Sequence, residues 1–123
     1  MIGYVTIGTN DLERAKAFYD KVLEPLGGKR TFANGERMQF YGGGSTPGMI
    51  AISKPYDEKT ATVGNGCMFG FPAATTEQVD ATYAAAIAAG ATCEGPPGQR
   101  MPTFYGAYFR DLDGNKICAF KMG

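Results

Sequence analysis

The sequence contains no histidine and no tryptophan among its 123 residues. Histidine is the commonest metal ligand and the usual general base near neutral pH. Its absence excludes Ser-His-Asp and Cys-His catalytic arrangements and every histidine-rich zinc or iron site. Any reaction at this protein must therefore use other side chains.

Cysteine is also scarce, with Cys67, Cys93 and Cys118 widely separated and in no C-x-x-C pair. An odd number with this spacing argues against a disulfide framework and against a structural zinc site. We expect three reduced and mostly buried thiols.

Charge of one sign and long apolar runs are both lacking. Twelve basic residues balance twelve acidic ones, so no net field attracts nucleic acid or a membrane surface. No apolar stretch has the length of a bilayer-spanning helix, and the amino terminus lacks the basic region and apolar run of a signal peptide. We expect a cytoplasmic protein with neither nucleic acid nor membrane as a partner.

The remaining composition is that of a globular protein, with 44% apolar and 20% charged residues. A chain of this length predicts one domain over residues 1–123.

The first half follows the order strand, helix and three strands. Alternation in residues 2–7 predicts a strand, and apolar residues at helical spacing after Asp11 predict a helix near residues 11–24. Asn34-Gly35 predicts a two-residue hairpin turn. The three further strands are expected at 31–33, 36–41 and 49–53.

The second half repeats that order. Residues 67–71 predict a strand, and Thr75 begins a helix with an apolar stripe that ends before Gly90. The stripe is expected to comprise Val79, Tyr83, Ala84 and Ile87. The remaining strands are expected at 92–94, 105–110 and 116–121.

At a constant offset Tyr4 aligns with Met68, Tyr19 with Tyr83 and Leu23 with Ile87. Two modules, about residues 1–56 and 65–123, are therefore predicted, and they must share burial because either alone leaves a sheet face uncovered.

Four segments resemble the vicinal-oxygen-chelate superfamily, which includes glyoxalases, bleomycin-resistance proteins and extradiol dioxygenases. The resemblance covers nearly the whole chain and depends on the order and spacing of residues 5–8, 11–19, 64–66 and 109–117. It implies an α+β fold of two βαβββ modules, whose eight strands form an open, barrel-like trough with the helices outside.

The resemblance also implies where a divalent metal ion would be held in metal-dependent members. Those positions fall here on Tyr4, Met68 and Cys118. A phenol, a thioether and a thiol do not form the hard oxygen and nitrogen site that Mg²⁺, Mn²⁺ or Fe²⁺ prefers. We therefore expect neither a metal nor another cofactor, and an apolar trough floor made by these three residues.

More specific chemical roles for single residues or segments have less support than a binding surface. Thioether and thiolate suit Cu(I), but three mixed residues on one face are more often its lining. Cys118 has no histidine to activate it as a nucleophile. Residues 111–115 resemble a calcium loop but lack its glycine and glutamate spacing, so a hairpin turn is expected.

Three further residues are candidates for binding a ligand. Arg100 follows a proline-stiffened connector and would present a guanidinium to a carboxylate or phosphate, against the alternative of a solvated charge. Phe40 and Tyr105 would stack on a planar molecule, although strand aromatics usually pack in the core.

Three functions remain open. The first is metal-free binding of a small molecule at Tyr4, Met68, Cys118, Arg100, Tyr105 and Phe40. The second is a lyase or isomerase without metal, with Tyr4 or Tyr105 as acid and Glu36 or Glu94 as base. The third is an interaction protein. Homodimers are common among proteins of this resemblance, so a homodimer is expected.

Overall fold

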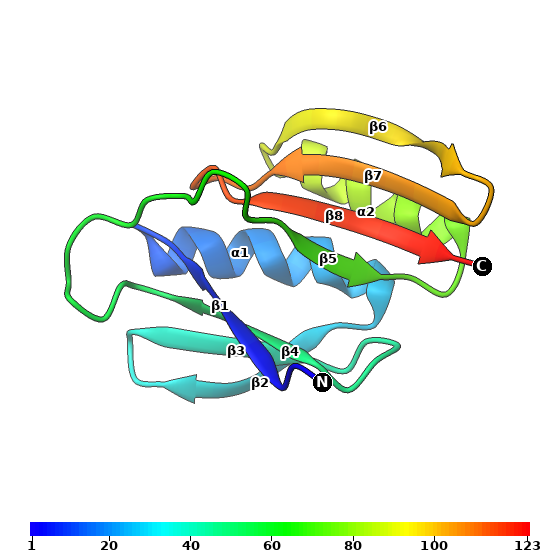
Figure 1. Cartoon of the computed structure of the whole chain (residues 1–123). Helices are drawn as coiled ribbons and strands as arrows, with labels where there is room; N and C mark the ends of the chain where they lie inside the picture. Colours follow the sequence, from blue (N-terminus) through cyan, green and yellow to red (C-terminus); the bar gives the residue numbers. More distant parts are fainter.

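Each half of the chain folds into a four-stranded mixed sheet and one α-helix, in a computed structural model that describes residues 1–123 (Figure 1). The first module comprises β1 (Tyr4–Gly8), α1 (Leu12–Leu23), the short 3₁₀ helix η1 (Glu24–Leu26), β2 (Lys29–Asn34), β3 (Met38–Gly42) and β4 (Met49–Ser53). The second comprises β5 (Phe69–Pro72), α2 (Thr76–Ala88), β6 (Thr92–Met101), β7 (Phe104–Arg110) and β8 (Lys116–Met122).

The two sheets have the same topology. The first has the order β1-β4-β3-β2 and the second β5-β8-β7-β6. In each, the first and last strands of the module pair in parallel, and the other pairs are antiparallel. The eight strands do not close into a barrel. The prediction of an α+β fold with two similar βαβββ modules in an open arrangement is confirmed.

Helix α1 forms where the sequence predicts it. The Asp11 side chain accepts a hydrogen bond from the Arg14 amide and so caps the helix. Pro25 lies in η1, and Gly27 ends the segment with φ of 80°. The buried stripe contains Leu12, Ala15, Phe18, Tyr19, Val22 and Leu23.

Helix α2 begins with a capping box between Thr75 and Gln78. Its predicted apolar stripe is half right: Val79 is buried and Tyr83 packs against the core, but Ala84 and Ile87 are exposed, and Thr82 and Ala86 are buried instead. The helix is rich in alanine, which has little preference for either face, so the sequence carries only a weak signal for its orientation.

Two loops also differ from expectation. Asn34 pairs with Met38, so the hairpin loop has three residues and Gly35 adopts φ of 58°. The proline-containing segment predicted as a connector is part of the irregular strand β6. β6 lies at the edge of its sheet, where proline costs no hydrogen bond to a second neighbouring strand.

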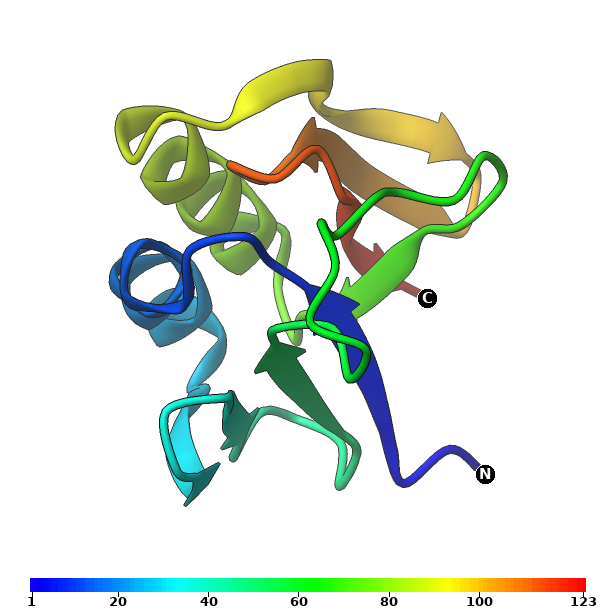
Figure 2. The same ribbon diagram turned by 90° about the vertical axis from the view of Figure 1, so that its left-hand side faces the viewer.

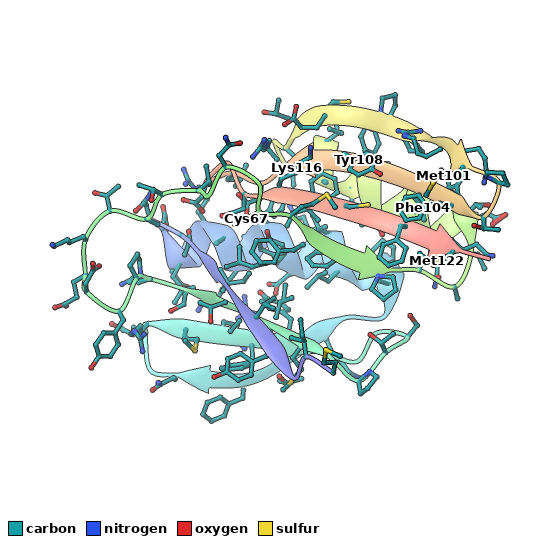
Figure 3. All side chains as sticks on the ribbon, in the orientation of Figure 1. Cys67, Met101, Phe104, Tyr108, Lys116 and Met122 are labelled. Atoms are coloured by element: carbon teal, nitrogen blue, oxygen red, sulfur yellow. The ribbon has the colours of Figure 1, made fainter.

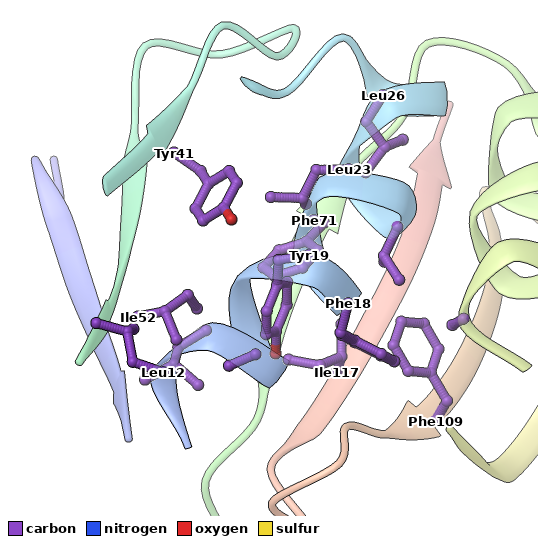
Figure 4. Close-up of a cluster of buried hydrophobic side chains, with 14 residues drawn as sticks. Leu12, Phe18, Tyr19, Leu23, Leu26, Tyr41, Ile52, Phe71, Phe109 and Ile117 are labelled. Carbon is purple, nitrogen blue, oxygen red and sulfur yellow. The ribbon is translucent and has the colours of Figure 1, made fainter. Parts of the chain in front are cut away.

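One core joins the modules (Figure 4). Its members include residues of α1, of the first sheet and of the second sheet, such as Phe18, Ile52 and Ile117. Figure 2 shows the helices together on one side, with the sheets curling around them. Two hydrogen bonds also connect the modules: Asn115 donates to the Gly8 carbonyl, and Thr9 donates to Asp113. No helix is both long and apolar enough to cross a bilayer.

Candidate functional site

Each sheet has one face against the helices and one open face. In β8, Ile117 and Ala119 pack in the two core clusters on the helix side. Successive strand residues point to opposite faces, so Lys116 and Cys118 lie on the other side. The side of each sheet away from the helices is its open face.

The open face of the first sheet is aromatic. Tyr4 is 55% exposed, and its ring meets the edge of Phe40 at 5.1 Å between centroids. Phe32 contacts the same Phe40 ring at 5.7 Å. Met49 is the register partner of Tyr4 and extends this surface. Phe40 thus lies on the open face, as its predicted binding role requires.

The open face of the second sheet combines sulfur, aromatic and cationic groups (Figure 3). Tyr108 pairs with Cys118, and Lys116 Nζ lies 5.7 Å from the centroid of the Tyr108 ring. The Arg100 guanidinium lies 5.5 Å from the same centroid. Met101, Phe104 and Met122 lie further along this face (Figure 3).

Met68 lies between the two sheets, just before β5. It lines a groove of about 310 Å³ with Ile2, Val5 and Met49. It also lines a cleft of about 530 Å³ that contains Cys67, Arg110 and Lys116. The seam between the modules is therefore hollowed on both sides of Met68.

Tyr4, Met68 and Cys118 do not form one floor within a single chain. Because α1 packs between the two sheets (Figure 4), their open faces diverge. The Tyr4 ring contacts Phe40 in the first sheet, whereas Cys118 lies beside Tyr108 in the second. The sequence predicts the strand positions of Tyr4 and Cys118 correctly, whereas Met68 lies just before β5 rather than in it. The prediction of one trough floor made by all three residues is wrong for a single chain.

The cysteines are only partly as expected. Cys67 and Cys93 are exposed, so the expectation of burial is wrong for both, while Cys118 is 1% exposed. Burial raises the pKa of the Cys118 thiol, and an opposing hydrogen bond from Tyr108 offsets part of that rise. A neutral, buried thiol is a poor nucleophile and a poor metal ligand.

The donor set does not fit the divalent ion of metal-dependent relatives. Tyr4 is packed on an aromatic ring, Met68 offers only a thioether, and Cys118 is buried as a thiol. No three acidic or sulfhydryl side chains come together in a way that would hold an ion. No step of a reaction is therefore assigned to a metal here.

Two of the four groups suggested for metal-free catalysis, Tyr105 and Glu94, are engaged elsewhere. The Tyr105 hydroxyl donates to Asp80 of α2 at 2.6 Å, so its side chain lies on the helix-covered face. This hydrogen bond raises the pKa of Tyr105. Glu94 is held by Arg110 at 2.6 Å, which lowers the pKa of that carboxyl. Glu36 is exposed in the β2–β3 loop. Tyr105 and Glu94 are therefore poorly placed for the suggested roles.

The sequence does not single out Lys116 as a site residue, and it marks Tyr108 only as one of several strand aromatics that suit stacking on a planar ligand. Alternation along β8 places Lys116 on the same face as Cys118, a signal available in the sequence. The contacts of Lys116 and Arg100 with the Tyr108 ring depend on the register between β7 and β8 and on the irregular course of β6. That register cannot be read from the residues alone.

Two βαβββ modules with open sheet faces define the class of the protein as a vicinal-oxygen-chelate fold. The sequence model of the "Glyoxalase/Bleomycin resistance protein/Dioxygenase superfamily" matches residues 1–119. The chain belongs to this superfamily.

Solved structures agree with this assignment. A glyoxalase/bleomycin resistance protein from Albidiferax ferrireducens T118 is 47% identical, with a TM-score of 0.91 and coverage of 100% of this chain and 99% of that one. A glyoxalase/bleomycin resistance protein/dioxygenase family enzyme from Burkholderia phytofirmans PsJN is 23% identical and shows a likeness of fold alone, with a TM-score of 0.76 and coverage of 98% of each chain.

More distant structures share the fold alone. The fosfomycin resistance protein FosX from Mesorhizobium loti is 20% identical, with a TM-score of 0.71 and coverage of 100% of this chain and 92% of that one. A search of curated protein sequences gives no match.

Proposed function

We propose that this protein binds a small organic molecule without a metal ion, at the open sheet faces of a homodimer. The observation that carries the proposal is the chemistry of Tyr4, Met68 and Cys118, a phenol, a thioether and a buried thiol, at the positions where the resemblance implies metal ligands. Such a surface favours apolar and aromatic contacts but offers no Lewis acid.

The homodimer is supported by the apolar character of both open faces. Tyr4 and Phe32 on the first sheet are 55% and 61% exposed, and Met101 and Met122 on the second are 57% and 65% exposed. Large exposed apolar patches mark interaction surfaces in soluble proteins. Each chain has one open face of each kind, so two copies can place the first sheet of one opposite the second sheet of the other.

This arrangement would complete the ligand site. Within one chain the two open faces diverge, so each provides only one wall. In the proposed dimer, Tyr4 and Phe40 of one protomer face the sheet that carries Cys118 in its partner. The ligand would lie between an aromatic wall and a wall of mixed sulfur, aromatic and cationic groups.

Metal analysis, light scattering and calorimetry on the purified protein test the proposal together. We expect substoichiometric Mn, Fe, Ni and Zn, a mass twice that of the chain, and saturable binding of a small aromatic compound such as benzamide or benzoate. A stoichiometric transition metal accompanied by turnover of a glutathione hemithioacetal would reject metal-free binding, and a persistent monomer would reject the two-chain site.

The alternative of a metal-free lyase or isomerase has less support. Of its suggested groups, Tyr105 is bonded to Asp80 on the helix side and Glu94 is paired with Arg110. Only Tyr4 remains on an open face, without a carboxylate as a hydrogen-bond partner. Turnover that falls sharply in Tyr4→Phe would favour this alternative.

A further inference from the structure

We propose that Arg100, Tyr108 and Lys116 form an anion-recognition subsite, and that the ligand is a small organic anion with an aromatic or apolar body. The inference rests on the proposed binding function and specifies its ligand class. The anionic group would be a carboxylate or a phosphate-type group, which share the negative oxygens that guanidinium and ammonium groups bind.

Arg100 and Lys116 make no ion pair. Three other arginines each contact a carboxylate, namely Arg14 with Asp113, Arg30 with Asp20 and Arg110 with Glu94. The carboxylate of Glu94, on the same strand β6 as Arg100, pairs with Arg110 at 2.6 Å and interacts with Lys116 only through a weaker charge effect. The two free cations are left facing the same aromatic ring.

Both cations contact the Tyr108 ring, Arg100 from β6 and Lys116 from β8, the two strands that flank β7. Arg100 lies 5.5 Å and Lys116 5.7 Å from the centroid of its ring. Each contact is a cation–π interaction, which fixes the position of a charge without neutralising it. Each positive charge therefore remains available to attract a bound anion.

The backbone of β6 makes room for the Arg100 side chain. A Cβ atom at Gly98 would lie 2.7 Å from Arg100 Nη1, and one at Gly95 would lie 3.2 Å from Arg100 Nη2. The guanidinium also donates to the Pro96 carbonyl. The side chain therefore lies along the strand against Tyr108, which orders part of the anion site before a ligand arrives.

The apolar body of the ligand has a surface beside these charges. Met101, Phe104 and Met122 lie further along the same open face (Figure 3). Phe104 is stacked on Phe120, with centroids 5.4 Å apart and planes 8° apart. In the other direction, Lys116 borders the cleft that contains Met68 and Cys67. An anion with an aromatic or aliphatic group can therefore contact both kinds of surface at once.

The test compares benzoate, phenyl phosphate and the neutral isostere benzamide by calorimetry and amide NMR titration at low ionic strength, where charge effects are least screened. We expect at least one anion to bind about tenfold or more tightly than benzamide, which is the scale of a charge-assisted hydrogen bond. The amide signals of Tyr108 and Cys118 should shift. The stronger of the two anions identifies the headgroup.

Three variants distinguish the loss of a positive charge from the displacement of the Arg100 guanidinium. Arg100→Met and Lys116→Met remove one cation each, and Gly98→Ala keeps both cations but displaces the guanidinium, whose flexible end can move without unfolding the strand. Each should weaken anion binding about tenfold and weaken benzamide binding much less, because benzamide has no negative charge for the cations to bind. Lys121→Met, on the same strand but next to Tyr105, is the matched control and should bind like the parent.

Failure of the anion subsite and failure of the proposed binding function would give different results. Equal affinity for the anions and benzamide would overturn the anion subsite and leave the proposed binding function standing. Unchanged anion binding in both Arg100→Met and Lys116→Met would also overturn it. Absence of binding by all three compounds would count against both proposals.

Discussion

The Tyr19 hydroxyl donates a 2.6 Å hydrogen bond to Asp111 Oδ2, and both side chains are buried. Tyr19 belongs to α1 of the first module, and Asp111 follows β7 of the second. Asp111 also accepts hydrogen bonds from the Asn115 side chain and from the amides of Asp113 and Asn115. A single carboxylate thus joins the two modules and closes the β7–β8 turn.

Tyr19→Phe should destabilise the protein by about 1.5–3 kcal/mol, because a buried carboxylate loses a hydrogen bond that water cannot replace. Urea denaturation with a common slope measures the change. Tyr56→Phe is the control, because Tyr56 is 87% exposed and should be neutral. Equal stability of Tyr19→Phe and the parent would show that the inter-module bond adds nothing.

A second carboxylate, Asp20 within the first module, predicts a pH dependence of stability. Burial opposes ionisation of Asp20, but hydrogen bonds from Arg30 and Tyr41 outweigh it and lower the pKa of this carboxyl. A lowered folded-state pKa stabilises the protein above the unfolded value near 4, and this contribution is lost as the pH falls through the folded value.

Asp20→Asn should therefore be less stable than the parent at pH 7, by under about 1 kcal/mol because the pair is partly exposed. The difference should shrink as the pH falls below about 4. Thermal melts of both proteins from pH 3 to pH 7 measure it. A difference that grows on acidification would contradict the assignment.

The three thiols should differ in reactivity. Cys118 is buried and its thiol pKa is raised, whereas Cys67 and Cys93 are exposed. Peptide mass spectrometry after brief iodoacetamide treatment should show Cys93 modified well before Cys118. Addition of urea should make Cys118 react at a similar rate. Early modification of Cys118 in the native protein would contradict its buried position.

Charge placed on the open faces should separate the proposed dimer. Phe32→Glu and Met122→Glu each put a carboxylate on an exposed apolar position, and should shift the mass measured by light scattering towards the monomer. Ile87→Glu changes an exposed apolar residue of α2 and should leave the mass unchanged. Circular dichroism checks that all three variants remain folded.

Tyr4 and Phe40 show what the alternation of residues along a strand can and cannot predict. Alternation predicts strands β1 and β3 and places these residues on defined faces of them. Whether Phe40 or Tyr41 faces the helices cannot be decided from alternation, because both faces carry aromatic residues. The structure places Tyr41 in the core, where its hydroxyl contacts Asp20, and Phe40 on the open face against Tyr4.

Tyr105 and Arg100 show why the sequence alone does not predict which residues form the site. Both are plausible ligand contacts by residue type, yet Tyr105 lies over α2 and Arg100 lies beside Tyr108. Their positions follow from the register of β7 and from the irregularities of β6. A shift of one residue exchanges the two faces of a strand, so residue type alone does not select the functional side.

The sequence by itself determines the two βαβββ modules, the caps at Asp11 and Thr75, and the absence of ion-coordinating groups at Tyr4, Met68 and Cys118. These are properties of local spacing and of side-chain chemistry. Only the tertiary structure decides that the open faces diverge and that Arg100 and Lys116 meet at Tyr108. The reason is physical, since packing around α1 and the register of paired strands arise from contacts between residues far apart in the chain.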